Sequence, residues 1–237
     1  MKTYNGIITE LKSLESVFGF DPTLVKQGSD EWRIMKLGVI SASEIDNVVA
    51  GKDTAKRATY MNELVGQVCT GRMPEEVSAK PLAWGKENEA SARSAYEFET
   101  SSEIKEVPFI YGDMFMRYGC SPDGILATKG LELKCPYATK THIEFICNQK
   151  IKSEYIKQCQ LAMMITGAEA WEFASYDPRM SKSLLHTVTI GRDEKMISLF
   201  QEAIAGFVYD MDKMLAMIGI RFGDQWKGYL TRFKQAA

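Results

Sequence analysis

The sequence predicts a single α/β domain over residues 1–237, with a mixed central sheet and helices packed on it. Apolar residues recur at helical spacing near both ends, over 7–20 and 193–218. Between them, several segments alternate apolar and polar residues, as strands do. No internal repeat, low-complexity run or linker divides the 237 residues, and 45% of them are hydrophobic, which is enough for one well-buried core.

Composition narrows the classes of function. The five cysteines are widely spaced, without the groupings of a zinc or iron–sulfur site, which predicts reduced thiols in a cytoplasmic protein. There is no run of about 18 apolar residues and no signal-peptide pattern, so we expect no membrane span. A net charge of −2 argues against a protein that coats nucleic acid nonspecifically, but it permits a local basic groove.

The N-terminal part predicts further helices after the first. Ser29 is placed to cap a helix that runs to about Lys36. Another helix is expected over 43–50, and the hydroxyl residues Ser41 and Ser43 stand at its start. A plain N-cap is the simpler interpretation of these hydroxyls. A helix N-terminus with hydroxyls also suits a phosphate, so a phosphate site stays open as the alternative.

Two longer helices are expected next. Residues 51–58 are basic and predict a loop, either solvated or in contact with a nucleic-acid backbone. A helix over 59–70 follows, and another over about 85–98. On the latter, Glu89 shares a face with Arg93, which indicates either an exposed ion pair or an acid that belongs to a site.

The middle of the chain carries the residues with the strongest chemical signal. Segments 104–111 and 114–120 alternate as strands, and Asp123 follows them. Glu132 and Lys134 then share one face of the next strand, because side chains alternate along a strand. Taken separately, Asp123-Gly124 is typical of a hairpin turn and Glu132-x-Lys134 of a cross-strand ion pair. Their combination is more specific than either motif.

The C-terminal half completes the prediction. Residues 137–150 give no clear pattern, whereas 153–166 predict a helix with Gln158 on its apolar side. The remaining expected elements are strands at 171–176 and 184–190 and the long helix 193–218. The tail contains Trp226, Tyr229 and Phe233, which we expect to dock on this chain or on a neighbour.

An aspartate, a glutamate and a lysine brought together indicate hydrolysis of a phosphodiester. The carboxylates of Asp123 and Glu132 are hard oxygen donors, which Mg²⁺ prefers. A metal polarises the phosphate and lowers the pKa of a water. The ammonium group of Lys134 orients that water or balances charge in the transition state.

The sequence as a whole resembles the phage lambda exonuclease family of viral recombinases, within the PD-(D/E)xK nuclease superfamily. The similarity covers about residues 25–226. The blocks that carry it are Gln27-Gly28-Ser29-Asp30-Glu31-Trp32, Leu37-Gly38-Val39-Ile40-Ser41-Ala42-Ser43-Glu44, Leu82-Ala83-Trp84-Gly85-Lys86, Cys120-Ser121-Pro122-Asp123-Gly124, Leu131-Glu132-Leu133-Lys134-Cys135-Pro136 and Tyr176-Asp177-Pro178-Arg179-Met180.

The resemblance implies a restriction-endonuclease-like fold and a specific activity. The expected enzyme is a Mg²⁺-dependent exonuclease that degrades one strand of linear double-stranded DNA from a 5′-phosphorylated end. It leaves a 3′ overhang for a single-strand annealing protein, in phage-type recombination. The resemblance also implies a ring-shaped homotrimer around DNA. Mn²⁺ is expected to substitute for Mg²⁺, since oxygen-rich sites generally accept it.

The resemblance also assigns roles to residues. Asp123, Glu132 and the Leu133 carbonyl would bind metal, with Glu89 supporting a second metal or its water. Lys134 would position the nucleophilic water, and Gln158 would complete the catalytic set. The 5′-phosphate would be held by four residues, Lys36, Ser41, Ser43 and Ser121.

Two positions depart from the family's prototype, and one residue has a mechanical role. The prototype has arginine where Lys36 stands, and lysine keeps the charge but loses the bidentate grip. Ser41 replaces a threonine. Leu82 would be an apolar wedge that parts the terminal base pairs, at a cost of about 1–2 kcal/mol per step.

Two other hypotheses fit the same residues. A structure-specific or restriction-type endonuclease would use the same metal residues, but it would need neither a terminal-phosphate pocket nor Leu82. An inactive module that binds DNA ends and recruits partners is the third hypothesis. The intact set of Asp123, Glu132 and Lys134 argues against it.

Overall fold

The computed structural model describes residues 1–74 and 80–228. Its helices are α1 (Tyr4–Lys12), α2 (Glu15–Phe18), α3 (Asp30–Met35), α4 (Ile45–Val48), α5 (Ala55–Thr70), α6 (Lys80–Thr100), α7 (Thr139–Asn148), α8 (Ser153–Thr166) and α9 (Glu194–Ile218). Short 3₁₀ turns, η1 (Pro22–Leu24) and η2 (Ala42–Glu44), precede α3 and α4. The strands are β1 (Ile40–Ser41), β2 (Ile110–Tyr111), β3 (Tyr118–Cys120), β4 (Gly124–Ile125), β5 (Gly130–Lys134), β6 (Ala170–Tyr176) and β7 (Leu185–Gly191).

The α/β class is confirmed, but the strands form two sheets where one central sheet was expected. One has the order β1-β3-β2 and the other β4-β5-β6-β7. In the second, β5 pairs in parallel with β6 and antiparallel with β4, so this sheet is mixed. The β5 strand therefore has neighbours on both sides, and its alternate side chains are sorted between two faces.

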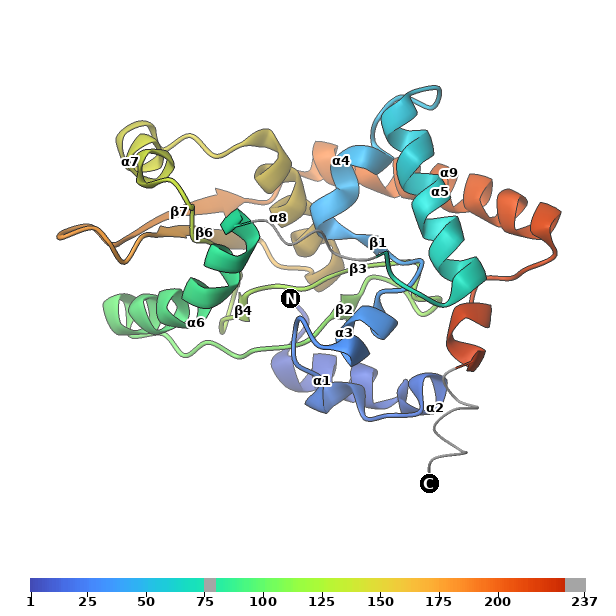
Figure 1. Cartoon of the computed structure of the whole chain (residues 1–237). Helices are drawn as coiled ribbons and strands as arrows, with labels where there is room; N and C mark the ends of the chain where they lie inside the picture. The colour runs from blue at the N-terminus through green and yellow to red at the C-terminus, as the bar shows by residue number, and fades with distance from the viewer. Residues whose placement is uncertain (75–79, 229–237) are drawn as a thin grey trace.

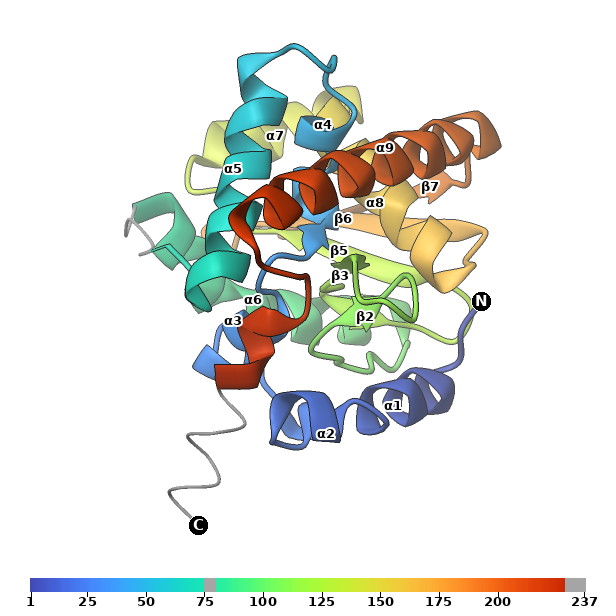
Figure 2. The same ribbon diagram turned by 90° about the vertical axis from the view of Figure 1, so that its right-hand side faces the viewer.

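Helices cover both faces of the larger sheet (Figures 1 and 2). On one face, Leu131 and Leu133 of β5 pack with Ala92 and Tyr96 of α6. On the other, α8 packs against β5 and β6 and also against α9. Glu132 points to the α8 side, as the strand alternation predicts. The long α9 crosses the molecule over α5 and α8 (Figure 2).

The C-terminal part of the described chain returns to the N-terminal helices. The Trp226 ring is 2% exposed and lies edge-on to Phe18, with ring centroids 5.5 Å apart. Its indole N–H donates to the Ile34 carbonyl at 2.8 Å. Docking of Trp226 on the same chain is therefore confirmed, whereas Tyr229 and Phe233 lie outside the described residues.

Most of the expected elements in the C-terminal half are confirmed. The 153–166 helix is α8, the two strands are β6 and β7, and 193–218 corresponds to α9. The cap at Ser29 is also correct, because its hydroxyl accepts a hydrogen bond from the Trp32 N–H. These segments combine strong periodicity with clear end signals, which explains why they could be predicted.

Elements with weak end signals were misplaced. The 7–20 helix is broken into α1 and α2, and strands 104–111 and 114–120 shrink to β2 and β3. The basic segment 51–58 is only partly a loop, because α5 begins at Ala55. Thr54 is its N-cap, and the Thr54 hydroxyl accepts a hydrogen bond from the Arg57 N–H. The helix expected at 85–98 begins earlier, at Lys80. The unassigned segment 137–150 contains α7, whose N-cap, Ala138, makes no side-chain bond.

Candidate active site

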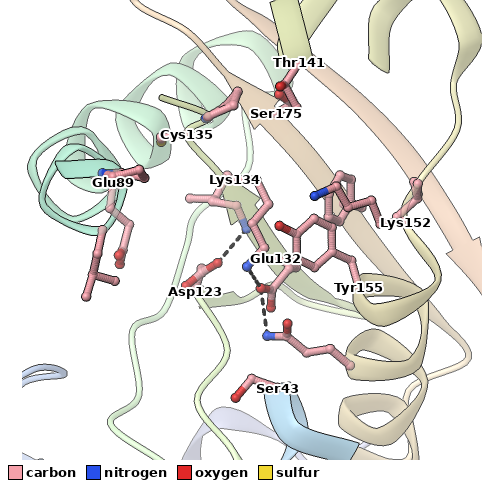
Figure 3. A pocket seen from close by; sticks show the side chains of 18 of the residues that line it. Ser43, Glu89, Asp123, Glu132, Lys134, Cys135, Thr141, Lys152, Tyr155 and Ser175 are labelled. Atoms are coloured by element: carbon pink, nitrogen blue, oxygen red, sulfur yellow. Dashed lines mark hydrogen bonds and ion pairs between the residues drawn. The ribbon is translucent and has the colours of Figure 1, made fainter. Parts of the chain in front are cut away.

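A pocket of about 1160 Å³ contains all the residues that the sequence singled out. They come from helices α6 and α8, strand β5 and the segments around β1, β3 and β4. The set that lines the pocket is Lys36, Ser41, Ser43, Leu82, Glu89, Ser121, Asp123, Glu132, Leu133, Lys134 and Gln158. Figure 3 shows Asp123, Glu132 and Lys134 converging at its centre.

Asp123 lies where β4 begins rather than in a hairpin turn, so the turn interpretation is wrong. Its carboxylate accepts a hydrogen bond from the Leu133 N–H at 2.6 Å, which ties it to the edge of β5. Burial and the nearby charge of Glu132 raise the pKa of Asp123 well above its usual range, with Lys134 opposing them. A half-buried and a buried carboxylate close together leave a local excess of negative charge.

Glu132 is 4% exposed and is held by two partners. The Lys134 ammonium donates to its carboxylate within the same strand, and the Gln158 amide donates to the same oxygen from α8 at 2.8 Å. The ion pair is therefore along one strand, and the cross-strand interpretation is wrong. Gln158 links α8 to the carboxylate, so helix packing positions the acid.

Lys134 lies between two carboxylates and an aromatic ring. Burial works to lower the pKa of Lys134, but the charges of Glu132 and Asp123 outweigh it and raise that pKa above its ordinary value. The ammonium nitrogen also lies 4.9 Å from the centroid of the Tyr155 ring, which stacks on Phe173. Lys134 is thus a stable cation, suited to orienting a water or an anion but not to acting as a base.

Glu89 lines the same pocket from α6 but has its own cation. Arg93, one helical turn later, donates to the Glu89 carboxylate and also pairs with Glu106 at 3.1 Å. The expected ion pair is confirmed. Within residues 1–74 and 80–228, no three Asp, Glu, His or Cys side chains come together as a group that could hold a metal ion.

The centre still fits a hard divalent cation. Mg²⁺ is commonly held by one or two carboxylates, with waters and substrate phosphate as its remaining ligands. Asp123 and Glu132 supply two carboxylates, and a cation would compensate their negative charge. The N–H and C=O of one strand residue point to the same side, so the Leu133 carbonyl faces Asp123 along with the Leu133 N–H.

A group of hydroxyls and a lysine lies in another part of the pocket. Ser41 and Ser43 are hydrogen bonded to each other at 3.1 Å, and Ser41 makes no side-chain cap bond. The plain N-cap interpretation of Ser41 is therefore wrong. The Ser121 hydroxyl accepts from the Trp32 indole at 3.1 Å, and the Lys36 ammonium lies 3.8 Å from the Trp32 ring centroid.

Leu82 lies in the first turn of α6 and lines the pocket while remaining 45% exposed. An exposed leucine at a pocket is suited to contacting an apolar face of a ligand. Glu89 lies on the same helix, seven residues further along. The position of α6 therefore determines where both residues lie relative to Asp123 and Glu132.

Comparison with protein families decides the relationship. Residues 31–169, more than half of the chain, match the YqaJ-like viral recombinase domain. The chain belongs to this family. It is also 47% identical over 79 residues to ExoD, an uncharacterized protein of Escherichia coli (strain K12); the match covers 33% of this chain and 91% of ExoD.

Solved structures support the assignment of this YqaJ-like recombinase to the exonucleases. The alkaline exonuclease LHK-Exo of Laribacter hongkongensis is 34% identical, with a TM-score of 0.74, over 81% of this chain and 96% of LHK-Exo. LHK-Exo in complex with dAMP matches equally, over 80% and 96% of the two chains. A phage-related exonuclease from Haemophilus somnus 129PT, 14% identical with a TM-score of 0.63 over 76% and 96%, shares the fold.

The YqaJ-like chain is thus a nuclease of the lambda exonuclease family, as the sequence blocks indicated. No described helix is both long and apolar enough to cross a membrane. Among the pocket residues to which the sequence assigned no role are Gln27, Trp32 and Tyr155. Gln27 and Trp32 stood in a family block, but nothing in that block showed that they bond to the segments around β2 and β3. Tyr155 lay on the apolar side of α8, where a ring is normally part of the core.

Proposed function

We propose that the chain is a Mg²⁺-dependent 5′-to-3′ exonuclease acting on one strand of linear double-stranded DNA. The observation that carries the proposal is the joint position of the Asp123–Glu132–Lys134 centre and the Ser41–Ser43–Ser121 hydroxyls in one pocket. The first suits phosphodiester hydrolysis, and the second suits a terminal phosphate. A nuclease that starts at a 5′-phosphorylated end needs both in reach of one nucleotide.

The hydrolytic roles follow from the contacts. Asp123, Glu132 and the Leu133 carbonyl would hold Mg²⁺, or Mn²⁺ in its place, with Glu89 supporting a second ion or its water. Bound there, the metal supplies positive charge for the phosphate and lowers the pKa of a water. Lys134, held by Glu132, orients that water toward phosphorus. Gln158 keeps the Glu132 carboxylate in place.

The end-recognition roles use the other part of the pocket. The 5′-phosphate would be held by charge-assisted hydrogen bonds from the Lys36 ammonium and the hydroxyls of Ser41, Ser43 and Ser121. Leu82 would press on the terminal base pair and help to part the strands. The match to LHK-Exo in complex with dAMP, a nucleotide, supports a nucleotide-sized ligand here.

The assembly and partners are proposed from the family. We expect a ring-shaped homotrimer through which the DNA passes, in the cytoplasm of a bacterial or phage-infected cell. The product, a duplex with a 3′ overhang, would be handed to a single-strand annealing protein for phage-type recombination. Light scattering coupled to gel filtration measures the oligomer directly, and a monomer in solution would contradict the ring.

One experiment separates the functional hypotheses. Purified protein and Mg²⁺ are given linear duplex with a 5′-phosphate, the same duplex with a 5′-hydroxyl, and a covalently closed circle. We expect rapid loss of one strand of the phosphorylated linear DNA, slower attack on the hydroxyl end, and an intact circle. Labelling each 5′ and 3′ end reports the polarity.

Each other result points elsewhere. Cutting of the circle would indicate the endonuclease. Equal rates on the two linear ends would keep the exonuclease and remove the phosphate role of Lys36 and the serines. DNA binding without any cleavage would indicate the inactive end-binding module.

A further inference from the structure

Arg179, in the segment between β6 and β7, makes contacts that the hydrolytic roles do not use. Its guanidinium donates to both carboxylate oxygens of Asp177, at 2.8 Å each. Asp177 is 0% exposed, and the hydrogen bonds from Arg179 lower the pKa of its carboxyl to about 2. The two residues therefore form a charged, bidentate pair with a defined geometry.

The same guanidinium reaches the segment that follows β5. It donates to the Tyr137 carbonyl at 3.0 Å and to the Pro136 carbonyl at 3.2 Å. Lys134 lies two residues before Pro136. Arg179 thus connects the β6–β7 segment to the chain that leaves the catalytic strand.

The face of the guanidinium lies against α6. Its central carbon is 4.3 Å from the centroid of the Trp84 ring, and the Trp84 and Tyr137 rings meet edge to face at 6.3 Å. The buried indole N–H of Trp84 has no hydrogen-bond partner among the described residues. Ring contacts, rather than hydrogen bonds from the indole, therefore hold Trp84. We call Trp84, Pro136, Tyr137, Asp177 and Arg179 the Arg179 cluster.

The N-terminal half of α6 is its less buried half. The buried residues of α6 are Ala92 and Tyr96, both in the second half of the helix. Residues 80–91 contain partly or fully exposed side chains only. Trp84 is the aromatic anchor of this half, with Leu82 two residues before it and Glu89 five residues after it.

We propose that Arg179 is a positioning residue that holds the N-terminal half of α6, and with it Leu82, against the pocket. The inference rests on the proposed exonuclease function. In that function Arg179 serves the opening of duplex ends and not the hydrolysis itself. Arg179 is therefore not required for cleavage when the DNA end is already unpaired.

The test uses Arg179→Lys, because lysine keeps a positive charge beside Asp177 and loses the fork and the flat face. Trp84→Leu removes the ring from the other side and serves as the second variant. The matched control is Arg192→Lys, whose guanidinium donates to the Met163 carbonyl at 2.7 Å and also contacts Ala168 and Glu194, none of which is in α6. All three variants are compared with the wild type and with Leu82→Ala.

Two readouts are taken. Without DNA, amide hydrogen exchange over 84–91 is expected to be about tenfold faster in both cluster variants, with 92–100 unchanged. With Mg²⁺, the rate of cleavage of a blunt 5′-phosphorylated duplex is expected to fall about tenfold. This is the change in rate that corresponds to opening one base-pair step without help from Leu82. A duplex with three unpaired 5′ nucleotides is expected to be cut at the wild-type rate, as with Leu82→Ala.

Unchanged hydrogen exchange over 84–91 in the two cluster variants would overturn the proposal. Equal losses of cleavage rate on the blunt and the open duplex would also overturn it. If the wild type degrades neither substrate, the proposed function fails. The exchange result still decides whether Arg179 positions α6, since it needs no activity. Arg192→Lys is expected to match the wild type in both readouts.

Discussion

At the scale of residues, the site combines groups that destabilise one another. Asp123 is half-buried and lies close to the buried Glu132. Among the described neighbours that shift the pKa of Asp123, only Lys134 supplies positive charge. Such a centre costs free energy in the absence of a cation, as strained and charged active sites commonly do. Function, rather than folding, explains why these residues are together.

Lys134→Ala is predicted to abolish cleavage while DNA binding survives. The ammonium orients the water in the proposed mechanism, and loss of such a group costs about 10²–10³ in kcat. Single-turnover cleavage and a gel-shift assay measure the two effects separately. Glu132→Gln is expected to behave alike, whereas retained turnover by purified Lys134→Ala would falsify the role assigned to the lysine.

Mg²⁺ is predicted to stabilise the protein through Asp123. Ligand present at about 100 times its Kd adds about 2.7 kcal/mol to the free energy of unfolding. The unfolding temperature of the wild type should therefore rise as Mg²⁺ is added in the absence of DNA. Asp123→Asn should respond weakly, and an equal response in both proteins would place the metal elsewhere.

Asp177 predicts a stability change at acidic pH. Its pKa is lowered to about 2 in the folded protein, so its stabilising charge is fully present above the ordinary value, about 4, and is lost as pH falls toward 2. Urea unfolding of the wild type and Asp177→Asn from pH 5 to pH 2.5 measures this. The difference between them should shrink as pH falls; a constant difference would contradict the assignment.

At the scale of elements, β5 is the strand that brings the site together. Its first residue, Gly130, lies opposite Trp171, and a Cβ added there would come within 2.2 Å of the Trp171 ring. That ring is buried and cannot move freely. The glycine therefore sets how closely β5 approaches β6, and so where Glu132 and Lys134 lie.

Gly130→Ala is predicted to lower the free energy of unfolding by about 1–3 kcal/mol, the usual cost of overpacking. Gly66→Ala is the matched control, because a Cβ at Gly66, inside α5, meets nothing within 4 Å. There the change should be neutral or stabilising by up to about 1 kcal/mol. Chemical denaturation of both variants measures the contrast, and equal effects would count against the Trp171 contact.

The sequence predicted those elements whose local signals agree with their packing. Apolar periodicity located α8, whose C-cap is Gly167, and α9, which Asp193 caps, while α7 was missed because it has neither a side-chain cap at its start nor a glycine at its end. The candidate catalytic residues came from the family blocks and from Glu132-x-Lys134. Tyr155 and Arg179 were not given roles, because their partners, Lys134 and Trp84, come from distant parts of the chain.

At the scale of the whole molecule, the last described segment closes over the first helices. Trp226 packs on Phe18 and bonds to Ile34, and Gln225 donates to the Leu37 carbonyl at 3.0 Å. These contacts join the two ends of the described chain across the α3 region, which also carries Lys36. Periodicity could not predict this, since it depends on where α9 directs the chain.

Trp226→Ala is predicted to destabilise the protein by about 3–5 kcal/mol, as loss of a buried aromatic side chain does. If residues 1–237 form one domain, unfolding stays a single transition in the variant. Circular dichroism and tryptophan fluorescence should then give coincident curves. Two separate transitions would show that the N-terminal helices unfold independently.

Pro122 has a consequence for the hydrogen bonds of β5. The Asp123 N–H donates to the Leu131 carbonyl of β5 at 3.1 Å, and Pro122 is the residue that precedes Asp123. Proline has no N–H and cannot donate to the Leu133 carbonyl. The Pro122 carbonyl is bonded to the Gln27 amide instead. The proline before the aspartate thus cannot extend the hydrogen bonds between Asp123 and β5 by one more N–H toward Leu133.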